Sequence, residues 1–277
     1  MVDGSERPAW SDRRRGLGEG QLIVSSNVPG RGVAPACPAG ALLVAGVDVE
    51  WSRNHRVAGG NVPFCYAVAW LVLPAGGARL DAVPVRYFCV HVREPGRAQD
   101  LVASAGRVLA TVLARASLVA GHQFGTDLAA LARVSARPVS GVEAARMAWR
   151  RRRLALPGRP RIMDTCYDAD HVLGCRSRRL TDICRDLGLH APRPELRDAS
   201  RAALRRQSVQ AAGTAAREKV MVLNLRHALC TALVAAYAAE LGRWPGALDI
   251  NRLLADRLNG AFGWLGDPAF AAPPGNG

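Results

Sequence analysis

Lysine is almost absent from this chain, and acidic residues are scarce. Lys219 is the one lysine among 277 residues, and 37 lysines and arginines stand against 23 acidic residues, giving a net charge of +14 and a pI of about 10.7. This excess predicts an anionic partner, with nucleic acid first and an acidic membrane surface second. Because nearly all of the charge is arginine, the side chains suit the two-pronged binding of phosphate.

Cys-x-x-Cys pairs are also missing. The seven cysteines are scattered and odd in number, so we expect neither a disulfide framework nor a zinc site, and a reducing cytoplasm fits. No apolar signal core follows Met1. The longest apolar helical run, Ala228–Ala239, is too short to cross a bilayer. We therefore expect a cytoplasmic protein with no membrane partner.

Composition divides the chain into three parts. Residues 1–38 are rich in Gly, Pro, Ser and Arg without periodicity, which predicts a disordered basic arm. Residues 39–245 carry strand-like and helix-like runs and predict one domain. Residues 246–277 predict a short helix, Asp249–Leu258, and a disordered tail rich in Pro and Gly.

Within the domain, periodicity predicts strands and helices in a definite order. The strand-like runs are Ala41–Trp51, Pro63–Leu73, Val83–Val92, Ser117–Ala120 and Arg161–Thr165. Short Gly-bearing links between the first three predict an antiparallel meander. Helical spacing marks Gln99–Ala114, Asp127–Val134, Leu180–Leu187, Asp198–Gln207 and Ala215–Leu241, and a basic interruption is predicted at Arg146–Arg161. The order predicts an α/β fold, a mixed five-stranded sheet flanked by helices.

Two carboxylates stand at the end of the first strand. Asp48 and Glu50 are two residues apart, so both side chains leave the same face of the strand. Neighbouring carboxylates at the end of a core strand repel each other, and a divalent cation such as Mg²⁺ or Mn²⁺ relieves the repulsion. The spacing alone fits a solvated strand edge equally well.

Further motifs follow in order. His122 comes directly after a short strand, and Asp127 opens a helix, where it can serve as an N-cap or as a third metal ligand. Asp164 and Thr165 end the last strand. A Leu-x-x-Ile-Cys-x-x-Leu-Gly pattern begins at Leu180, and the long helix carries Ala-Leu-Cys-Thr-Ala directly after His227.

Together these motifs resemble the DEDD (DnaQ-like) superfamily of 3′–5′ exonucleases, over roughly residues 41–241. The resemblance implies a ribonuclease H-like fold. It implies that Asp48, Glu50 and Asp127 bind two metal ions, Mg²⁺ or Mn²⁺, in a protein that hydrolyses phosphodiester bonds of nucleic acid from a 3′ end. The motifs fit DNA and RNA alike.

The last motif departs from the family pattern. Where the family has an aspartate before Ala-Leu-x-Thr-Ala, this chain has His227, and the positions expected to hold Tyr or His are Leu223 and Val222. Three outcomes stay open. His227 acts as a metal ligand or a base; or Glu218 or Asp164 substitutes for the missing acid; or the fold is catalytically degenerate and binds nucleic acid without cleaving it.

An arginine cluster follows the second motif. An aromatic residue stands directly before four consecutive arginines, and such a segment can hold phosphates and stack a base. A solvated surface loop is the alternative. The residues that we predict to contact nucleic acid are Trp51, His122, Trp149, Arg150, Arg151, Arg152 and Arg153.

Overall fold

A six-stranded mixed sheet forms the centre of the protein. The computed structural model describes residues 22–30, 32–51, 62–154, 157–174, 176–190, 214–258, 260–267 and 270. In spatial order the strands are β1 (Leu22–Ser26), β5 (Val85–Val92), β3 (Pro63–Leu73), β2 (Leu42–Trp51), β6 (Leu118–Gly121) and β7 (Arg161–Asp164). The pairs β1–β5, β5–β3 and β3–β2 are antiparallel, whereas the pairs β2–β6 and β6–β7 are parallel. An α/β fold with a mixed sheet is therefore confirmed.

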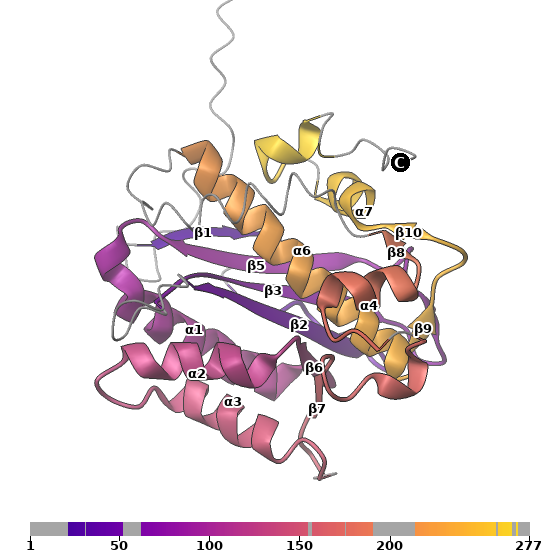
Figure 1. The fold of residues 1–277 in the computed structure, drawn as a ribbon, viewed down its shortest axis with the longest axis horizontal. Coiled ribbons are helices and arrows are strands. Elements are labelled where there is room, and N and C mark those ends of the chain that lie inside the picture. Colours follow the sequence, from indigo (N-terminus) through magenta and orange to yellow (C-terminus); the bar gives the residue numbers. More distant parts are fainter. Residues whose placement is uncertain are drawn as a thin grey trace, which may run out of the picture.

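Helices cover both faces of the sheet (Figure 1). One face carries α1 (Ala98–Arg115), α2 (Phe124–Val134) and α3 (Ser140–Arg150). The other carries α6 (Thr214–Ala238), against which α4 (Leu180–Asp186) and α7 (Ile250–Arg257) pack. Two short strand pairs join loops: β4 (Ala78–Arg79) with β9 (Gly242–Arg243), and β8 (Leu189–His190) with β10 (Leu248–Asp249). Short 3-10 helices occupy Pro95–Arg97, Asp170–Val172 and Gly263–Gly266.

The parallel strands end together at one edge of the sheet. In the register, Val47 of β2 pairs with Gly121 of β6, and Gly121 pairs with Asp164 of β7. β2 continues beyond this point to Trp51, so its last residues have no parallel neighbour in the described sheet. The carboxyl ends of parallel strands are where α/β proteins usually bind ligands.

The strand β1 corrects two predictions. The predicted sheet has five strands, and the predicted disordered arm covers residues 1–38, yet β1 pairs with β5 from Leu22↔Val92 to Ser26↔Phe88. Asn27 extends this pairing because its side chain bonds the main chain of β5 at both Tyr87 and Val85. A five-residue run is too short to stand out from its Gly- and Pro-rich surroundings. The earlier part of the arm lies outside the described residues.

Helix α3 is a further correction. Arg146–Arg150 belongs to this helix and not to an irregular basic interruption. The basic residues conceal the helical pattern, and the apolar face is narrow because α3 packs closely on α1. A Cβ atom at Gly141 would lie 1.9 Å from the Gly106 carbonyl oxygen. The predicted helix Asp198–Gln207 lies outside the described residues.

Helix α6 is the core helix of the protein. Its segment Arg217–Ala238 is long and apolar enough to cross a membrane, and it is longer than the run Ala228–Ala239 that the sequence predicts to be too short. However, 89% of its apolar window is buried inside the protein. The helix lies directly on β2, since a Cβ atom at Gly46 would be 2.0 Å from the Ala228 carbonyl oxygen. Only glycine allows this approach, and it fixes the position of α6 over the end of β2.

The C-terminal segment is more ordered than the sequence predicts. The expected helix is present as α7. Beyond it, the described part of the tail packs on α6: Trp264 and Phe270 are buried, the Trp264 amide donates to Glu218, and Lys219 lies over the Trp264 ring. These two aromatic side chains anchor a segment whose average composition is typical of disorder. Residues 271–277 lie outside the described residues.

Candidate metal centre

Three of the predicted site residues meet at the junction of β2 and α6. The side chains of Asp48, Glu50 and His227 offer ligand atoms that all lie within 4.8 Å of one another. The Nδ1 atom of His227 is 3.6 Å from an Asp48 oxygen and 3.5 Å from a Glu50 oxygen. All three side chains are partly buried. The two carboxylates share a strand face as predicted, and the histidine of the long helix faces them.

His227 carries a positive charge in this arrangement. Burial on its own would lower the pKa of His227, but the carboxylates of Asp48 and Glu50 beside the ring outweigh burial and raise that pKa to about 9. The protonated ring therefore offsets part of the repulsion between the two acids. A metal ion bound by Nδ1 would have to replace this proton, since only neutral imidazole ligates.

Asn224 is a site residue that sequence reasoning missed. It is fully buried one turn before His227 on α6, and its Nδ2 donates to Asp48 Oδ2 at 2.6 Å. Its Oδ1 accepts from the Cys65 thiol at 3.8 Å. A buried amide held in this way fixes the orientation of the Asp48 carboxylate. The signal was present in the sequence, because Asn224, His227 and Thr231 form a polar stripe at helical spacing on an apolar helix.

Asp127 lies beside the cluster but outside the set of three. Its carboxylate is buried and accepts a hydrogen bond from the Val49 amide, on the part of β2 that extends beyond β6. Its Oδ2 atom has no hydrogen-bond partner among the described residues. Burial, followed by the charges of Asp48 and Glu50, raises the pKa of Asp127 well above its usual range. Asp127 is therefore a buried acid whose Oδ2 atom has no partner among the described residues and whose proton is held by burial and by the two neighbouring carboxylates.

A second positive charge is buried next to the cluster. Arg226 is 3% exposed, and its Nε and Nη1 atoms have no hydrogen-bond partner among the described residues. Burial lowers the pKa of Arg226 to about 10, while the nearby Glu50 and Asp48 charges oppose that shift. His227 thus lies against the carboxylates of Asp48 and Glu50, and Arg226 adds a second positive charge that these carboxylates influence without forming an ion pair with it among the described residues.

Glu218 and Asp164, the two acids considered as substitutes at the His227 position, both have structural partners elsewhere. Glu218 accepts the Trp264 amide at 2.6 Å and belongs to the C-terminal contact. Asp164 is fully buried and accepts from three backbone amides and from the Trp149 indole. One of these amides belongs to Phe124, the first residue of α2. Asp164 therefore fixes the start of α2, and with it the helix that carries Asp127.

His122 also has a supporting position. It lies at the end of β6, where its Nδ1 atom is 3.1 Å from the Thr165 hydroxyl oxygen. Burial lowers the pKa of His122, although Asp164 and Asp48 act in the opposite direction. His122 is partly buried and its ring is held by a hydroxyl group, so it supports the end of β6, and its predicted contact with nucleic acid stays a prediction.

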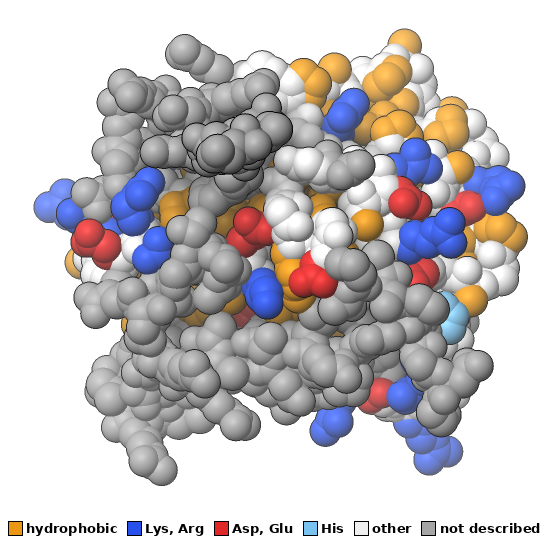
Figure 2. All heavy atoms as spheres, turned by 90° about the horizontal axis from the view of Figure 1, so that it is seen from above, with side chains coloured by type: hydrophobic (Ala, Val, Ile, Leu, Met, Phe, Trp, Pro, Cys, Tyr) orange, Lys and Arg blue, Asp and Glu red, His pale blue; other side chains and the backbone are white. Residues whose placement is uncertain are grey.

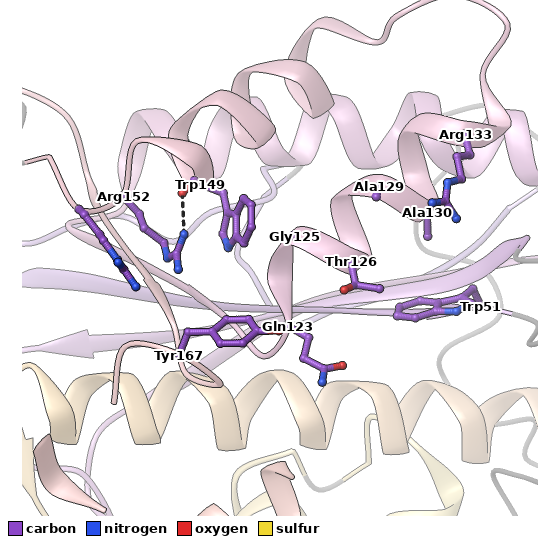
Figure 3. A pocket seen from close by; sticks show the side chains of 11 residues that line it. Trp51, Gln123, Gly125, Thr126, Ala129, Ala130, Arg133, Trp149, Arg152 and Tyr167 are labelled. Carbon is purple, nitrogen blue, oxygen red and sulfur yellow. Dashed lines mark hydrogen bonds between the residues drawn. The ribbon is translucent and has the colours of Figure 1, made fainter. Parts of the chain in front are cut away.

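A cavity of about 450 Å³ adjoins the end of β2. Trp51 lies at one end of it near Arg133, and Tyr167, Trp149 and Arg152 lie at the other, with α2 forming the wall between them (Figure 3). Tyr167 is 50% exposed. The cavity thus combines aromatic rings with guanidinium groups, and one of its lining residues, Trp51, directly follows Glu50 in the sequence.

The predicted contact residues Trp149 to Arg153 divide into two groups. The Trp149 indole is held by Asp164, and the Arg152 guanidinium lies 4.6 Å from the ring centre while pairing with Asp168 at 2.7 Å. These two side chains build the wall of the cavity. Arg150, Arg151 and Arg153 are exposed. The arginine cluster lies on the side of the molecule that carries α3 (Figure 1). Figure 2 shows the opposite side, where basic and acidic side chains are interspersed.

Comparison of the chain with family profiles and with curated proteins gave no match. The assignment of a function therefore depends on the geometry of the metal-ligand cluster and on the cavities around it.

Proposed function

We propose that this protein is a metal-dependent phosphodiesterase of the DEDD exonuclease type, with a ribonuclease H-like fold, which removes nucleotides from a 3′ end. The observation that carries the proposal is the convergence of Asp48, Glu50 and His227 at the carboxyl end of β2. The order of elements also supports it, since an antiparallel meander, β2, β3 and β5, is followed by the parallel strands β6 and β7.

The residues present fit a divalent cation. Asp48 and Glu50 supply hard oxygen ligands, His227 supplies a nitrogen, and the unpartnered Oδ2 of Asp127 lies beside them. A nitrogen ligand in place of the fourth carboxylate favours Mn²⁺ over Mg²⁺. A bound cation would supply Lewis-acid activation of water and stabilise charge on the leaving oxygen.

The chain's own residues contribute orientation and charge. Asn224 fixes Asp48, and the Val49 amide fixes Asp127. Arg226 adds a buried positive charge within electrostatic reach of Asp48 and Glu50, which would help to stabilise negative charge on a phosphoryl group. Trp51 and Tyr167 offer ring surfaces on which the terminal bases can stack.

The test is cleavage of 5′-labelled single-stranded DNA and RNA with Mn²⁺ or Mg²⁺. We expect stepwise shortening from the 3′ end that is faster with Mn²⁺. Asp48→Asn should slow cleavage by more than the roughly 10–100-fold that loss of a supporting residue costs. Asp256→Asn, which removes an exposed acid of α7, is the matched control. No shortening with either metal, or equal cleavage by Asp48→Asn, would refute the proposal.

A second candidate function is nucleic-acid binding without hydrolysis. The observation that favours it is charge balance: His227 and Arg226 already offset Asp48 and Glu50 without a metal. In that case oligonucleotide binding would be strong in a chelator, unchanged by Mn²⁺ and unchanged by Asp48→Asn, and no nucleotide would be released. If the protein is instead a phosphodiesterase, nucleotides are released when Mn²⁺ is added, and Asp48→Asn reduces that release.

A further inference from the structure

Two cavities meet at the arginine cluster. The second, of about 940 Å³, lies between the C-terminal half of α3, the segment that follows it and the strand β7 at the edge of the sheet. Arg152 and Arg153 line both this cavity and the smaller one beside the metal centre. The two cavities therefore lie on either side of these two side chains, and we name the second one the α3–β7 cavity.

The α3–β7 cavity is rich in unbalanced positive charge. Arg151, Arg153, Arg159 and Arg161 line it and are exposed. Within the described part of the chain, none of the four forms an ion pair, whereas Arg146 and Arg152 do, with Glu143 and Asp168. Four unpaired guanidinium groups around one cavity attract a ligand with several negative charges.

Apolar surface is exposed in the same place. The large hydrophobic side chains that are exposed in the described residues are Met147, Leu154 and Tyr167. The first two line the α3–β7 cavity, and Tyr167 lines the smaller cavity. A ligand that covers this surface must present apolar faces as well as negative charge. A single strand of nucleic acid does so, because its bases are free to stack, whereas a duplex presents mainly phosphates.

We propose that the α3–β7 cavity binds the phosphates and bases of a single-stranded nucleic acid whose 3′ end occupies the metal centre. The strand would pass from Trp51 and Tyr167 across Arg152 and Arg153 to Arg159 and Arg161. This inference rests on the proposed function and deepens it, since it names the substrate as a single strand long enough to fill both cavities.

The test measures how strongly a long and a short oligonucleotide depend on arginines at two different places in the protein. Fluorescence anisotropy in a chelator measures binding of a single strand of about 12 nucleotides. For Arg159→Gln/Arg161→Gln we expect about tenfold weaker binding and a salt slope reduced by about 1.4, since each phosphate contact contributes about 0.7. Arg252→Gln/Arg257→Gln removes the same charge from exposed positions of α7, on the other face of the sheet, and should bind like the wild type.

Cleavage of a labelled dinucleotide with Mn²⁺ separates this inference from the proposed function. A dinucleotide has a single internal phosphate, which cleavage places at the metal centre and which therefore leaves none for the α3–β7 cavity, so both arginine variants should cleave it at the wild-type rate. The inference is overturned if the two double variants bind the long strand equally, if duplex binds as well as single strand, or if polyglutamate displaces the strand at equal charge. Failure of the wild-type protein to cleave the dinucleotide would instead refute the proposed function.

Discussion

At the scale of residues, the candidate site depends on side chains that orient the carboxylates. Asp48 and Glu50 were predictable because residues two apart on a strand share a face whatever the surrounding fold. His227 was predictable from the motif that follows it. Asn224 and Arg226 were not predicted, because the face that a residue of a buried helix presents depends on how the helix is rotated over the sheet. The close approach at Gly46 sets that rotation.

Removing the Asn224 amide should weaken the metal centre. Asn224→Ala leaves the Asp48 carboxylate without its 2.6 Å donor, and loss of such a supporting contact costs roughly 10–100-fold in metal affinity. Titration calorimetry with Mn²⁺ measures the effect, and circular dichroism checks that the variant is folded. Thr231→Ala is a suitable control on the same helix. Unchanged affinity in Asn224→Ala would show that Asp48 needs no orienting donor.

The stability of the metal-free protein should fall as the pH rises from about 6.5 to about 9. The pKa of His227 is about 9 in the folded protein and 6.5 in the absence of its neighbours. The folded state therefore holds the proton more tightly, so this contribution is complete below pH 6.5 and is lost as the pH passes 9. In a chelator, the wild-type melting temperature should drop by roughly a few degrees more than that of His227→Gln. Parallel curves for the two proteins would contradict the assigned pairing.

At the scale of elements, the sequence predicts well where the pattern is strong and long. Strand β3 has the predicted bounds, and β2, β5, α1 and α7 agree within about two residues at each end. The prediction fails where the pattern is short or mixed. β1 has five residues within a Gly- and Pro-rich stretch, and α3 combines a small packing face with a basic one. Both depend on a partner far away in the sequence, β5 and α1.

The contact between β2 and α6 should be sensitive to a single methyl group. In Gly46→Ala the new Cβ would lie 2.0 Å from the Ala228 carbonyl oxygen, so α6 must shift. We expect the free energy of unfolding to fall by about 1–3 kcal/mol, and Mn²⁺ affinity to fall as well because His227 is next to Ala228. Urea unfolding and calorimetry measure the two effects.

Gly96→Ala is the matched control for this substitution. Nothing lies within 4 Å of a Cβ atom at Gly96, so its free energy of unfolding should change by less than about 0.5 kcal/mol. Equal behaviour of the two variants would mean that α6 does not pack on β2 as closely as described.

At the scale of the whole molecule, charge and topology act together. The net charge of +14 predicts an anionic partner but gives no location for it. In the folded chain, Arg152 and Arg153 line the cavity next to the end of β2, and the exposed Arg159 and Arg161 line the α3–β7 cavity along the edge strand β7. An acidic centre with an arginine-lined cavity next to the same strand end would suit a phosphodiester substrate, because the arginines would attract the phosphates while the carboxylates would hold a cation.

The central claim is that the cluster of Asp48, Glu50 and His227 binds a divalent cation. Calorimetric titration of the purified protein with Mn²⁺ tests it most directly, with Asp48→Asn and the exposed-acid control Asp256→Asn measured beside the wild type. We predict saturable binding by the wild type and by Asp256→Asn, and its loss in Asp48→Asn. Absence of Mn²⁺ binding by the wild type, or equal binding by Asp48→Asn, would contradict the account.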